Sequence, residues 1–360
     1  MLAFAATAWY QNGPYAMSNL RIRWIRLLGR GLNAIRGFDR YGAPTSYFGP
    51  GGVAEAEALC AAANRDLFEY LRPPATFDPR NPARGPAVRR TRFDVQSWSF
   101  DSPRPSGDLY NDRVGVRVYR RQGAQAADHV VLFHHPLYQR WHGVWEFFLG
   151  PLIEHVPVAI MAGPWHFQRS AACRFPGEGT VNPNPYRLFE SLRQWCHDHH
   201  ATVRLLEREA RLRVVAEIGY SLGGFQILNL ASAGEIDVPL VTVSSTNRYA
   251  WGLWNGVMGH NIKAGMRAVG IDYERLAEMT RELQAERHVA VLRGTPTLYV
   301  YGGHDYVDPP PSLERLREQL QPTRTLFFPK TGHAGIVFRA RRVMTEVLEF
   351  LLETGALDPA

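Results

Sequence analysis

The sequence predicts an α/β fold, with a mostly parallel, twisted sheet flanked by helices. From residue 90 onward, short apolar runs rich in β-branched residues alternate with helix-like runs. This alternation is typical of a parallel sheet whose two faces are both covered. One apolar run leads through a glycine-rich turn directly into a helix-like run, at residues 214–233. The 360 residues, 45% hydrophobic and 21% charged, suffice for one large domain or two smaller ones.

Residues 1–89 are expected to form a helical N-terminal extension. A helix is predicted from Ala54 to Leu71, followed by a connecting segment at 72–90 that is rich in proline and arginine. The first nine residues are apolar but lack a basic region, so no signal peptide is expected.

The net charge of +7 is concentrated in residues 18–40, which carry six arginines against one acid. We favour a helix that packs its apolar side on the main domain and leaves its arginines in solvent. Contact with an anionic membrane surface is the less favoured alternative. The aromatic residues of the chain do not interleave with the basic ones as stacking platforms, so no nucleic-acid partner is expected.

The remaining elements follow from the hydrophobic periodicity. Strands are predicted at Arg92–Phe100, Val114–Arg120, His129–Phe133, Val156–Met161, Arg213–Ile218, Leu240–Ser244, Thr297–Tyr301 and Thr325–Pro329. Helices are predicted at 140–154, 185–209, 223–233, 311–320 and 335–353. The first two strands follow each other without a helix between them, which predicts an antiparallel edge.

The stretch between the sixth and seventh of these strands is too long for a simple crossover. It contains three helix-like runs, Tyr249–Gly259, Ile262–Val269 and Tyr273–Glu286. These runs predict a helical cap inserted at residues 248–293. The core of the fold is then expected to comprise two segments, 90–247 and 294–360.

The turn Gly219-Tyr220-Ser221-Leu222-Gly223-Gly224 has the pattern G-x-S-x-G. Between a strand and a helix, such a turn holds the serine in a strained backbone conformation with its hydroxyl pointing outward. The glycines two residues to either side avoid a collision between a Cβ and the neighbouring strand or helix. We therefore predict that Ser221 is a nucleophile. The alternative is an incidental serine in a glycine-rich turn.

A nucleophilic serine needs a base to take its proton and a carboxylate to orient that base. The expected order along the chain is serine, acid, histidine, each after a strand. The last two predicted strands run into Gly302-Gly303-His304-Asp305 and Gly332-His333. His333 is the predicted base and Asp305 the predicted acid. Asp308 is the alternative acid, or else the cap of the helix that follows.

With these motifs the sequence resembles the α/β-hydrolase superfamily, and within it bacterial carboxylesterase-like proteins with a helical cap. The matching segments are 219–224, 302–305, 332–333 and the strand end His134-His135. The resemblance covers about residues 90–355. It implies the roles of nucleophile, acid and base for Ser221, Asp305 and His333.

The oxyanion hole departs from the common pattern of this superfamily. One donor is predicted to be the backbone N–H of Leu222, directly after the nucleophile. The loop that supplies the second donor usually begins His-Gly, but here it reads His134-His135-Pro136-Leu137-Tyr138. Because proline has no N–H, Leu137 is the predicted donor. The side chains of His135 and Tyr138 are further candidates, and the two histidines are alternatively structural.

Five side chains are candidates for substrate contact. Trp165 follows Gly163-Pro164, where related hydrolases often have a Pro-aromatic-His segment near the rim of the site. It either contacts the substrate or anchors its loop. Trp251 and Trp254 line a pocket or form the core of the cap. His135 and Tyr138 complete the set.

The run His197-Asp198-His199-His200 suggests a metal site, but no third ligand with matching spacing accompanies it. We interpret it as a solvated helix segment and expect no metal. No G-x-G-x-x-G or phosphate loop follows a strand, so no cofactor is expected. Three widely spaced cysteines, Cys60, Cys173 and Cys196, favour a reducing compartment and hence the cytoplasm.

These features predict a serine hydrolase that cleaves carboxylic esters of small molecules through an acyl-enzyme intermediate. Esters are favoured only by their frequency as substrates in the superfamily. A thioesterase, acyltransferase or peptidase would use the same three residues, because the triad does not select the acyl group. A non-catalytic binding protein on the same fold is the alternative from another class.

Overall fold

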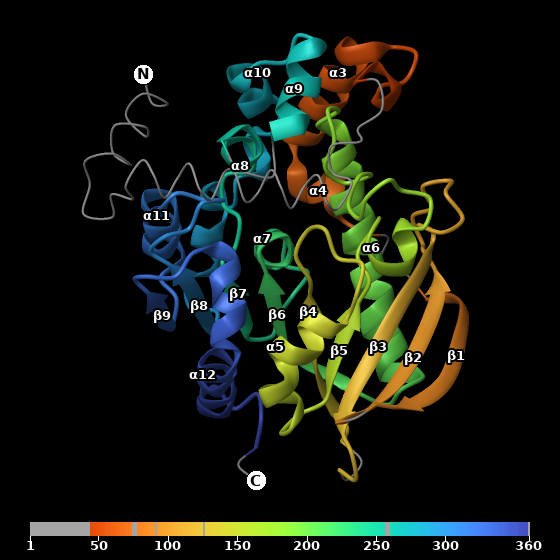
Figure 1. Cartoon of the computed structure of the whole chain (residues 1–360), viewed down its shortest axis with the longest axis vertical. Helices are drawn as coiled ribbons and strands as arrows, with labels where there is room; N and C mark the ends of the chain where they lie inside the picture. Colours follow the sequence, from red (N-terminus) through yellow and green to blue (C-terminus); the bar gives the residue numbers. More distant parts are fainter. Residues whose placement is uncertain (1–43, 74–77, 91, 125–126, 256–259, 359–360) are drawn as a thin grey trace.

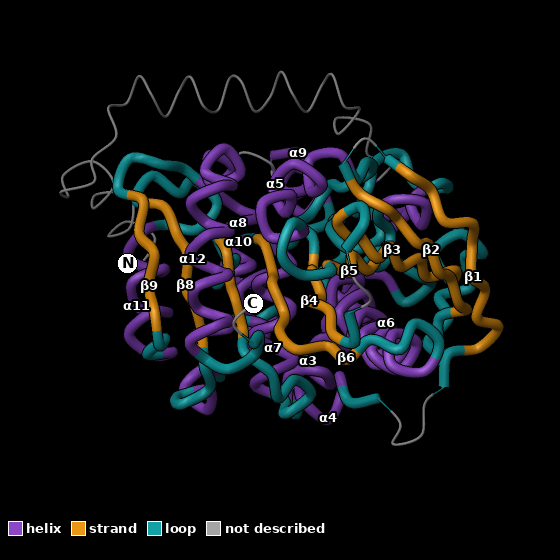
Figure 2. Tube along the Cα trace, turned by 90° about the horizontal axis from the view of Figure 1, so that it is seen from below, coloured by secondary structure: helices purple, strands orange, loops and turns teal. Residues whose placement is uncertain are grey.

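The computed structural model describes residues 44–73, 78–90, 92–124, 127–255 and 260–358. Within these ranges the chain forms one sheet with helices on both sides (Figures 1 and 2). The strands are β1 (Arg80–Arg89), β2 (Phe93–Asp101), β3 (Arg113–Arg121), β4 (His129–His134), β5 (Val158–Met161), β6 (Arg213–Tyr220), β7 (Leu240–Val243), β8 (Thr297–Gly302) and β9 (Arg324–Phe328). Their order in the sheet is β1-β2-β3-β5-β4-β6-β7-β8-β9.

The strand directions confirm the predicted fold class. From β5 through β4 to β9, neighbouring strands run parallel. The strands β1, β2 and β3 pair antiparallel with one another, and β3 pairs antiparallel with β5. The eight predicted strands correspond to β2 through β9, and the antiparallel edge lies where it was expected.

The prediction of a connecting segment over residues 72–90 is wrong for 80–89, which form the edge strand β1. Nearly all of its residues are exposed, so the sequence contains no apolar alternation to reveal it. It contains Pro82 and Pro86, which an edge strand tolerates because only one side of it needs N–H donors. The helical description of residues 1–89 therefore does not extend to this segment.

Ten α-helices and several short 3₁₀ turns surround the sheet in the described ranges. The helices are α3 (Gly52–Arg65), α4 (Leu67–Leu71), α5 (Gly143–Ile153), α6 (Tyr186–Arg208), α7 (Leu222–Ser232), α8 (Tyr249–Asn255), α9 (His260–Ala268), α10 (Tyr273–Met279), α11 (Pro310–Leu320) and α12 (Ala340–Glu353). The helix predicted from Ala54 to Leu71 is divided at Asp66, whose backbone is extended and whose side chain accepts a hydrogen bond from the Glu69 N–H at 2.9 Å. The helix predicted at 335–353 begins with a 3₁₀ turn, η7 (His333–Arg339).

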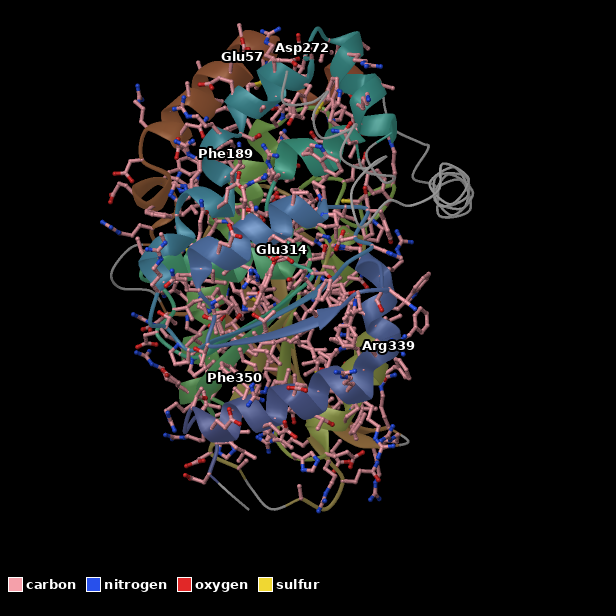
Figure 3. All side chains as sticks on the ribbon, turned by 90° about the vertical axis from the view of Figure 1, so that its left-hand side faces the viewer. Glu57, Phe189, Asp272, Glu314, Arg339 and Phe350 are labelled. Atoms are coloured by element: carbon pink, nitrogen blue, oxygen red, sulfur yellow. The ribbon has the colours of Figure 1, made fainter. Side chains whose placement is uncertain are left out.

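The core lies in two layers, one on each face of the sheet. Alternate residues of β4 show this division, because Val131 and Phe133 pack with residues of α5 and α12, whereas Leu132 packs with residues of α6. Phe350 of α12, labelled in Figure 3, is fully buried in the first layer. This arrangement leaves the carboxyl ends of the parallel strands to carry the loops that matter for function.

Three helices, α8, α9 and α10, are inserted after β7, and α10 lies next to α3 (Figure 1). Glu57 of α3 forms a bidentate ion pair with Arg275 of α10, and its Oε2 lies 2.6 Å from Arg275 Nη2. The Asn64 side chain donates to the carbonyl oxygens of Glu278 and Met279, at 3.2 and 3.0 Å. Figure 3 labels Glu57 at this junction.

The division into 1–89, 90–247 with 294–360, and 248–293 stays a prediction. Residues 1–43, with the basic segment 18–40, lie outside the described residues. In the part of the chain that is described, no helix combines the length and the apolar character needed to cross a membrane.

Candidate active site

Ser221 lies at the sharp turn between β6 and α7. Its backbone has φ 54° and ψ −112°, a region that residues other than glycine rarely adopt. Two main-chain hydrogen bonds hold this turn: the Ser221 N–H donates to the Val243 carbonyl at 2.8 Å, and the Phe225 N–H donates to the Ser221 carbonyl at 2.9 Å. The strained conformation predicted for the serine is therefore present.

Close backbone contacts explain the glycines around Ser221. A Cβ on Gly219 would lie 2.4 Å from the carbonyl oxygen of Gly223. A Cβ on Gly224 would lie 3.1 Å from the carbonyl oxygen of Gly219. Larger residues would push β6 and α7 apart, so these positions favour glycine for the reason that the motif predicts.

A chain of hydrogen bonds connects the three predicted catalytic residues. Ser221 Oγ lies 2.7 Å from His333 Nε2, and His333 Nδ1 lies 2.8 Å from Asp305 Oδ2. The three side chains come from the loops after β6, β8 and β9, and all are buried, Ser221 with 7% of its surface exposed. Because Nδ1 faces a carboxylate, it carries the proton and leaves Nε2 free to accept the serine proton.

Further hydrogen bonds hold the acid and the base in position. The Asp305 Oδ1 atom accepts from the N–H groups of Val307 and Asp308, at 2.8 and 3.0 Å. The Tyr220 hydroxyl donates to the carbonyl oxygen of His333 at 2.6 Å. The neighbour of the serine thus holds the loop that carries the histidine.

Asp308, the alternative acid, has a different set of partners. Its Oδ2 atom accepts from the N–H groups of Asn247 and Arg248, the latter at 3.0 Å, so it ties the loop after β8 to the loop after β7. Burial raises the pKa of Asp308 to about 6, although these two N–H groups act to lower it. It does not cap the following helix, since α11 begins after Pro309 without a side-chain cap.

His135 braces the loop of the predicted second oxyanion donor. Its Nδ1–H donates to the carbonyl oxygen of Pro136 at 2.8 Å, and its Nε2 accepts from the Gly163 N–H at 2.9 Å. Burial lowers its pKa well below the usual value, so the ring is neutral. The structural interpretation of His135 therefore fits its contacts better than substrate binding does.

The two predicted oxyanion donors come from the start of α7 and from the loop after β4. Leu222 is the first residue of α7, so its N–H has no partner within the helix. Leu137 follows Pro136, and its carbonyl accepts from the Gln139 side chain at 2.9 Å. Their role as donors stays a prediction.

The predicted aromatic contacts have partners of their own. Trp165 has a positive φ of 65° and lies against Gly179, where a Cβ would be 2.1 Å from its ring. The Tyr138 ring lies 5.8 Å from that of Phe175. Trp254 packs against the core that includes the cap helices, where Arg267 lies 5.2 Å from its ring centre. These contacts agree with Trp165 anchoring its loop and with Trp254 forming part of the cap. Trp251 is half-buried on α8.

Comparisons with known proteins support the fold. No family model and no curated protein matches the sequence. The structure is similar to acetyl xylan esterase 1 from Thermoanaerobacterium sp., with a TM-score of 0.54 and 15% identity over 78% of this chain and 93% of that chain. It is also similar to a peroxisomal alpha-beta-hydrolase from Saccharomyces cerevisiae, with a TM-score of 0.50 and 15% identity over 75% and 92%. The chain has the α/β-hydrolase fold.

A third similar structure is acylaminoacyl peptidase from Pyrococcus horikoshii, with a TM-score of 0.53 and 13% identity over 73% of this chain and 41% of that chain. The three neighbours thus include an esterase and a peptidase. At these identities the likeness establishes the α/β-hydrolase fold, and the reaction has to be argued from the residues of the site.

The prediction that His197-Asp198-His199-His200 is a solvated segment is wrong. In this α/β-hydrolase fold the first three of these residues are buried. Asp198 and His199 face the loop after β5 and the sheet, whereas His197 lies on the other side of α6. Asp198 forms a fully buried ion pair with Arg169 at 2.7 Å and accepts from the Ser102 hydroxyl at 2.6 Å. Asp198 therefore belongs to a buried polar cluster with Arg169 and Ser102.

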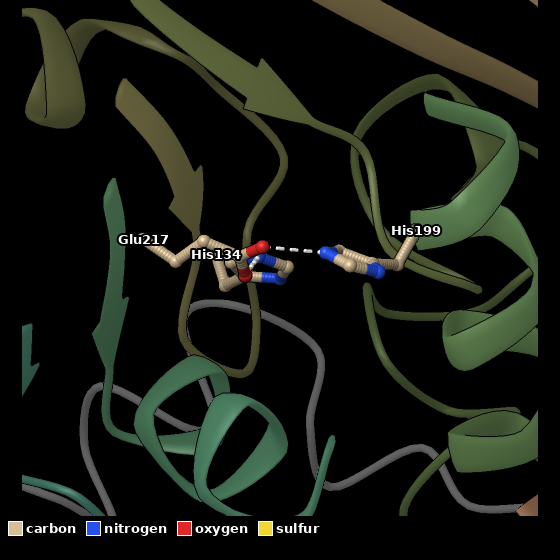
Figure 4. A group of neighbouring side chains, drawn as sticks. All are labelled: His134, His199 and Glu217. Carbon is tan, nitrogen blue, oxygen red and sulfur yellow. Dashed lines mark hydrogen bonds and ion pairs between the residues drawn. The ribbon is translucent and has the colours of Figure 1, made fainter. Parts of the chain in front are cut away.

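His199 belongs to a second buried cluster, together with His134 and Glu217 (Figure 4). Their ligand-type atoms all lie within 4.8 Å of one another, the sole group of this kind among the described residues. Glu217 Oε1 lies 2.6 Å from His199 Nε2, and Oε2 lies 2.8 Å from His134 Nε2. Burial raises the pKa of Glu217, but the two imidazoles outweigh this effect and hold it at about 2.

The hydrogen bonds of His134 do not suit a metal ligand. The indole N–H of Trp195 donates to His134 Nδ1 at 3.2 Å, so Nδ1 carries no proton. The proton of a neutral ring is then on Nε2, where it points at Glu217 and leaves no lone pair for a metal. The cluster is therefore a hydrogen-bonded network that connects α6, β4 and β6.

Sequence reasoning missed Glu217 and Arg169. Glu217 interrupts the apolar run of β6, and a carboxylate in a buried strand requires partners that satisfy it. That interruption was the available signal. Arg169 gave no such signal, because its partner Asp198 is supplied by a helix whose orientation the sequence does not specify.

Proposed function

We propose that the protein is a serine hydrolase that cleaves carboxylic esters of small molecules through an acyl-enzyme intermediate. The hydrogen-bonded chain from Ser221 through His333 to Asp305 carries this proposal. It supplies a nucleophile, a base and an orienting acid in the order that the α/β-hydrolase fold requires.

The proposed reaction begins when His333 Nε2 takes the proton of Ser221 and the Oγ atom attacks the ester carbonyl. The N–H groups of Leu222 and Leu137 then donate to the oxyanion, and one such donor contributes roughly 3–4 kcal/mol to the stability of the transition state. The alcohol leaves with the proton from His333. A water molecule, deprotonated by His333, next attacks the acyl-enzyme and releases the carboxylic acid, while Asp305 stays ionised and holds the imidazolium.

The site does not by itself select esters over thioesters or amides. The same residues would serve a thioesterase, an acyltransferase or a peptidase, and a peptidase is among the structures with this fold. We choose ester hydrolysis because two similar structures are acetyl xylan esterases. The proposal includes a reducing, cytoplasmic setting, supported by three cysteines that are free in the structure.

Turnover of p-nitrophenyl acetate and butyrate by the wild type and by Ser221→Ala tests the assignment. We expect the variant to lose at least ~10³-fold in kcat, because the attacking atom is removed while the fold remains. Labelling of the wild type, but not of the variant, by a fluorophosphonate would identify the nucleophile directly. Equal turnover by the two proteins would leave only a binding role for the fold.

A further inference from the structure

An open pocket of about 640 Å³ lies on the outer face of α6. Arg193 and His197, one turn apart on this helix, form one wall. Trp195 and His199 lie on the opposite side of the same helix, where they contact His134 and Glu217. The pocket therefore lies behind α6 and is separate from the serine site.

Two other segments complete the pocket. The end of α4 supplies Glu69 and Arg72, and the loop after β2 supplies Arg104. The remaining lining residues are Pro73, Pro103 and Pro105. Proline restricts the backbone, so these three residues limit the motion of the two segments that carry Arg72 and Arg104.

The arginines offer donors that the protein leaves unused. The buried Nε atoms of Arg104 and Arg193 have no hydrogen-bond partner. Almost all buried N–H groups in folded proteins are paired, so the protein satisfies these two guanidinium groups only in part. The Nε atoms themselves are covered, and a ligand in the pocket would meet the terminal nitrogens of the two half-buried side chains.

Contacts outside the pocket hold these side chains in place. The guanidinium of Arg193 lies over the Tyr70 ring, 4.7 Å from its centre. Arg104 Nη2 lies 3.2 Å from Glu190 Oε2, and Glu190 in turn accepts from the Tyr186 hydroxyl at 2.9 Å. A ligand would therefore meet arginines whose conformations are already restricted, which lowers the entropy that binding costs.

The lining carries three positive side chains and one acid, Glu69, which pairs with Arg72 at 2.6 Å. Glu190, which pairs with Arg104, is a second acid next to the lining, so the three arginines exceed the nearby acids by one charge. The neighbouring imidazole responds to this excess of positive charge. Burial, and then the charges of Arg104 and Arg193, lower the pKa of His197 to about 4. An anion in the pocket would reduce the repulsion among these groups.

We propose that this pocket binds a small molecule that carries a phosphate group. Guanidinium groups match phosphate oxygens with paired donors, and three of them suit a doubly charged group better than a single carboxylate. The volume exceeds that of a bare ion and lies in the range of small-ligand sites. The proposal does not depend on the hydrolase activity.

Isothermal titration calorimetry at low salt tests this proposal with inorganic phosphate, glucose 6-phosphate, glucose and acetate. We expect saturable binding of the two phosphates, at least ~10-fold weaker binding of acetate, and no binding of glucose. Absence of binding by either phosphate would overturn the proposal without any variant. Acetate binding as tightly as phosphate would overturn the ligand class.

The double variant Arg72→Gln/Arg193→Gln should weaken phosphate binding at least ~10-fold, because it removes two charge-assisted donors. Arg341→Gln removes an exposed arginine of α12 and should bind like the wild type. Equal affinity of the double variant and this control would overturn the proposal. Both variants should turn over p-nitrophenyl butyrate at the wild-type rate, so failure of this site and failure of the hydrolase proposal give different results.

Discussion

A Cβ atom on Gly223 would lie 2.0 Å from the backbone carbonyl oxygen of His134. The first turn of α7 and the carboxyl end of β4 are therefore in direct backbone contact. Leu222 directly precedes Gly223, and Leu137 follows His134 by three residues, so this contact joins the two segments that carry the proposed oxyanion donors. No side chain larger than that of glycine fits between α7 and the His134 carbonyl oxygen.

Gly223→Ala should consequently lower both stability and turnover. The added methyl group has to displace backbone, which costs roughly 1–3 kcal/mol in the free energy of unfolding, and the displacement misaligns the oxyanion donors. Gly143→Ala is the matched control, because nothing lies within 4 Å of a Cβ at that position. Urea unfolding measures the stability, and p-nitrophenyl butyrate turnover measures the activity. Equal values for Gly223→Ala and Gly143→Ala would contradict the close packing.

Asp305→Asn and Asp308→Asn should separate the two acids. Asp305→Asn is expected to reduce kcat by ~10⁴-fold, since an amide opposite His333 Nδ1 favours the wrong tautomer. Asp308→Asn removes an acceptor of two backbone N–H groups and should affect mainly stability. A larger loss of kcat in Asp308→Asn than in Asp305→Asn would transfer the acid role to Asp308.

Asp198→Asn should destabilise the fold more than any change to an exposed ion pair. It leaves Arg169, which is fully buried, without its counter-charge, and breaking such a pair costs about 3–5 kcal/mol. Arg92→Gln disrupts the exposed pair with Glu154 and should cost less than ~1 kcal/mol. Chemical denaturation gives the free energy of unfolding of the two variants. Equal losses in this free energy would show that the buried pair stabilises the fold no more than the exposed pair does.

Stability should fall as the pH decreases from about 6.5 toward 4. Burial lowers the pKa of His142 to about 3 and that of His166 to about 4, so the unfolded chain binds protons in this window while the folded protein does not. Each such histidine contributes up to ~1.4 kcal/mol per pH unit. Burial raises the pKa of Asp308, Asp198 and Glu235, which act in the opposite direction, but these are three carboxyls against six imidazoles whose pKa burial lowers.

Urea unfolding between pH 7.5 and 4.5 checks this dependence. The free energy of unfolding should depend less steeply on pH in His142→Gln than in the wild type. The difference is the contribution of one histidine, since Gln does not titrate. Constant stability over the range would mean that the buried imidazoles are protonated in the folded state as readily as in the unfolded chain.

The parallel strands were predictable because both of their faces are buried, which leaves apolar runs in the sequence. The exposed edge strand β1, with two prolines, leaves no such run. The sequence predicted that Ser221, Asp305 and His333 lie together because each follows a parallel strand, and the ends of these strands meet at one edge of the sheet.

The polar interior could not be derived in the same way. The pairing of Glu217 with His134 and His199 depends on which face of α6 meets the sheet, and the hydrophobic pattern of α6 was compatible with an exposed histidine run. Likewise, the separate roles of Asp305 and Asp308 rest on the path of one short loop, which spacing alone leaves open.

The association of α3 with α10 limits how this protein can be re-engineered. Glu57, Asn64 and the buried residues Ala56, Cys60 and Ala63 belong to a helix that precedes the sheet, whereas Arg275 belongs to the insert after β7. Grafting a foreign insert at 248–293 would leave the α3 surface without its complement. Chimaeras built to alter substrate choice would therefore have to exchange both segments as a matched set.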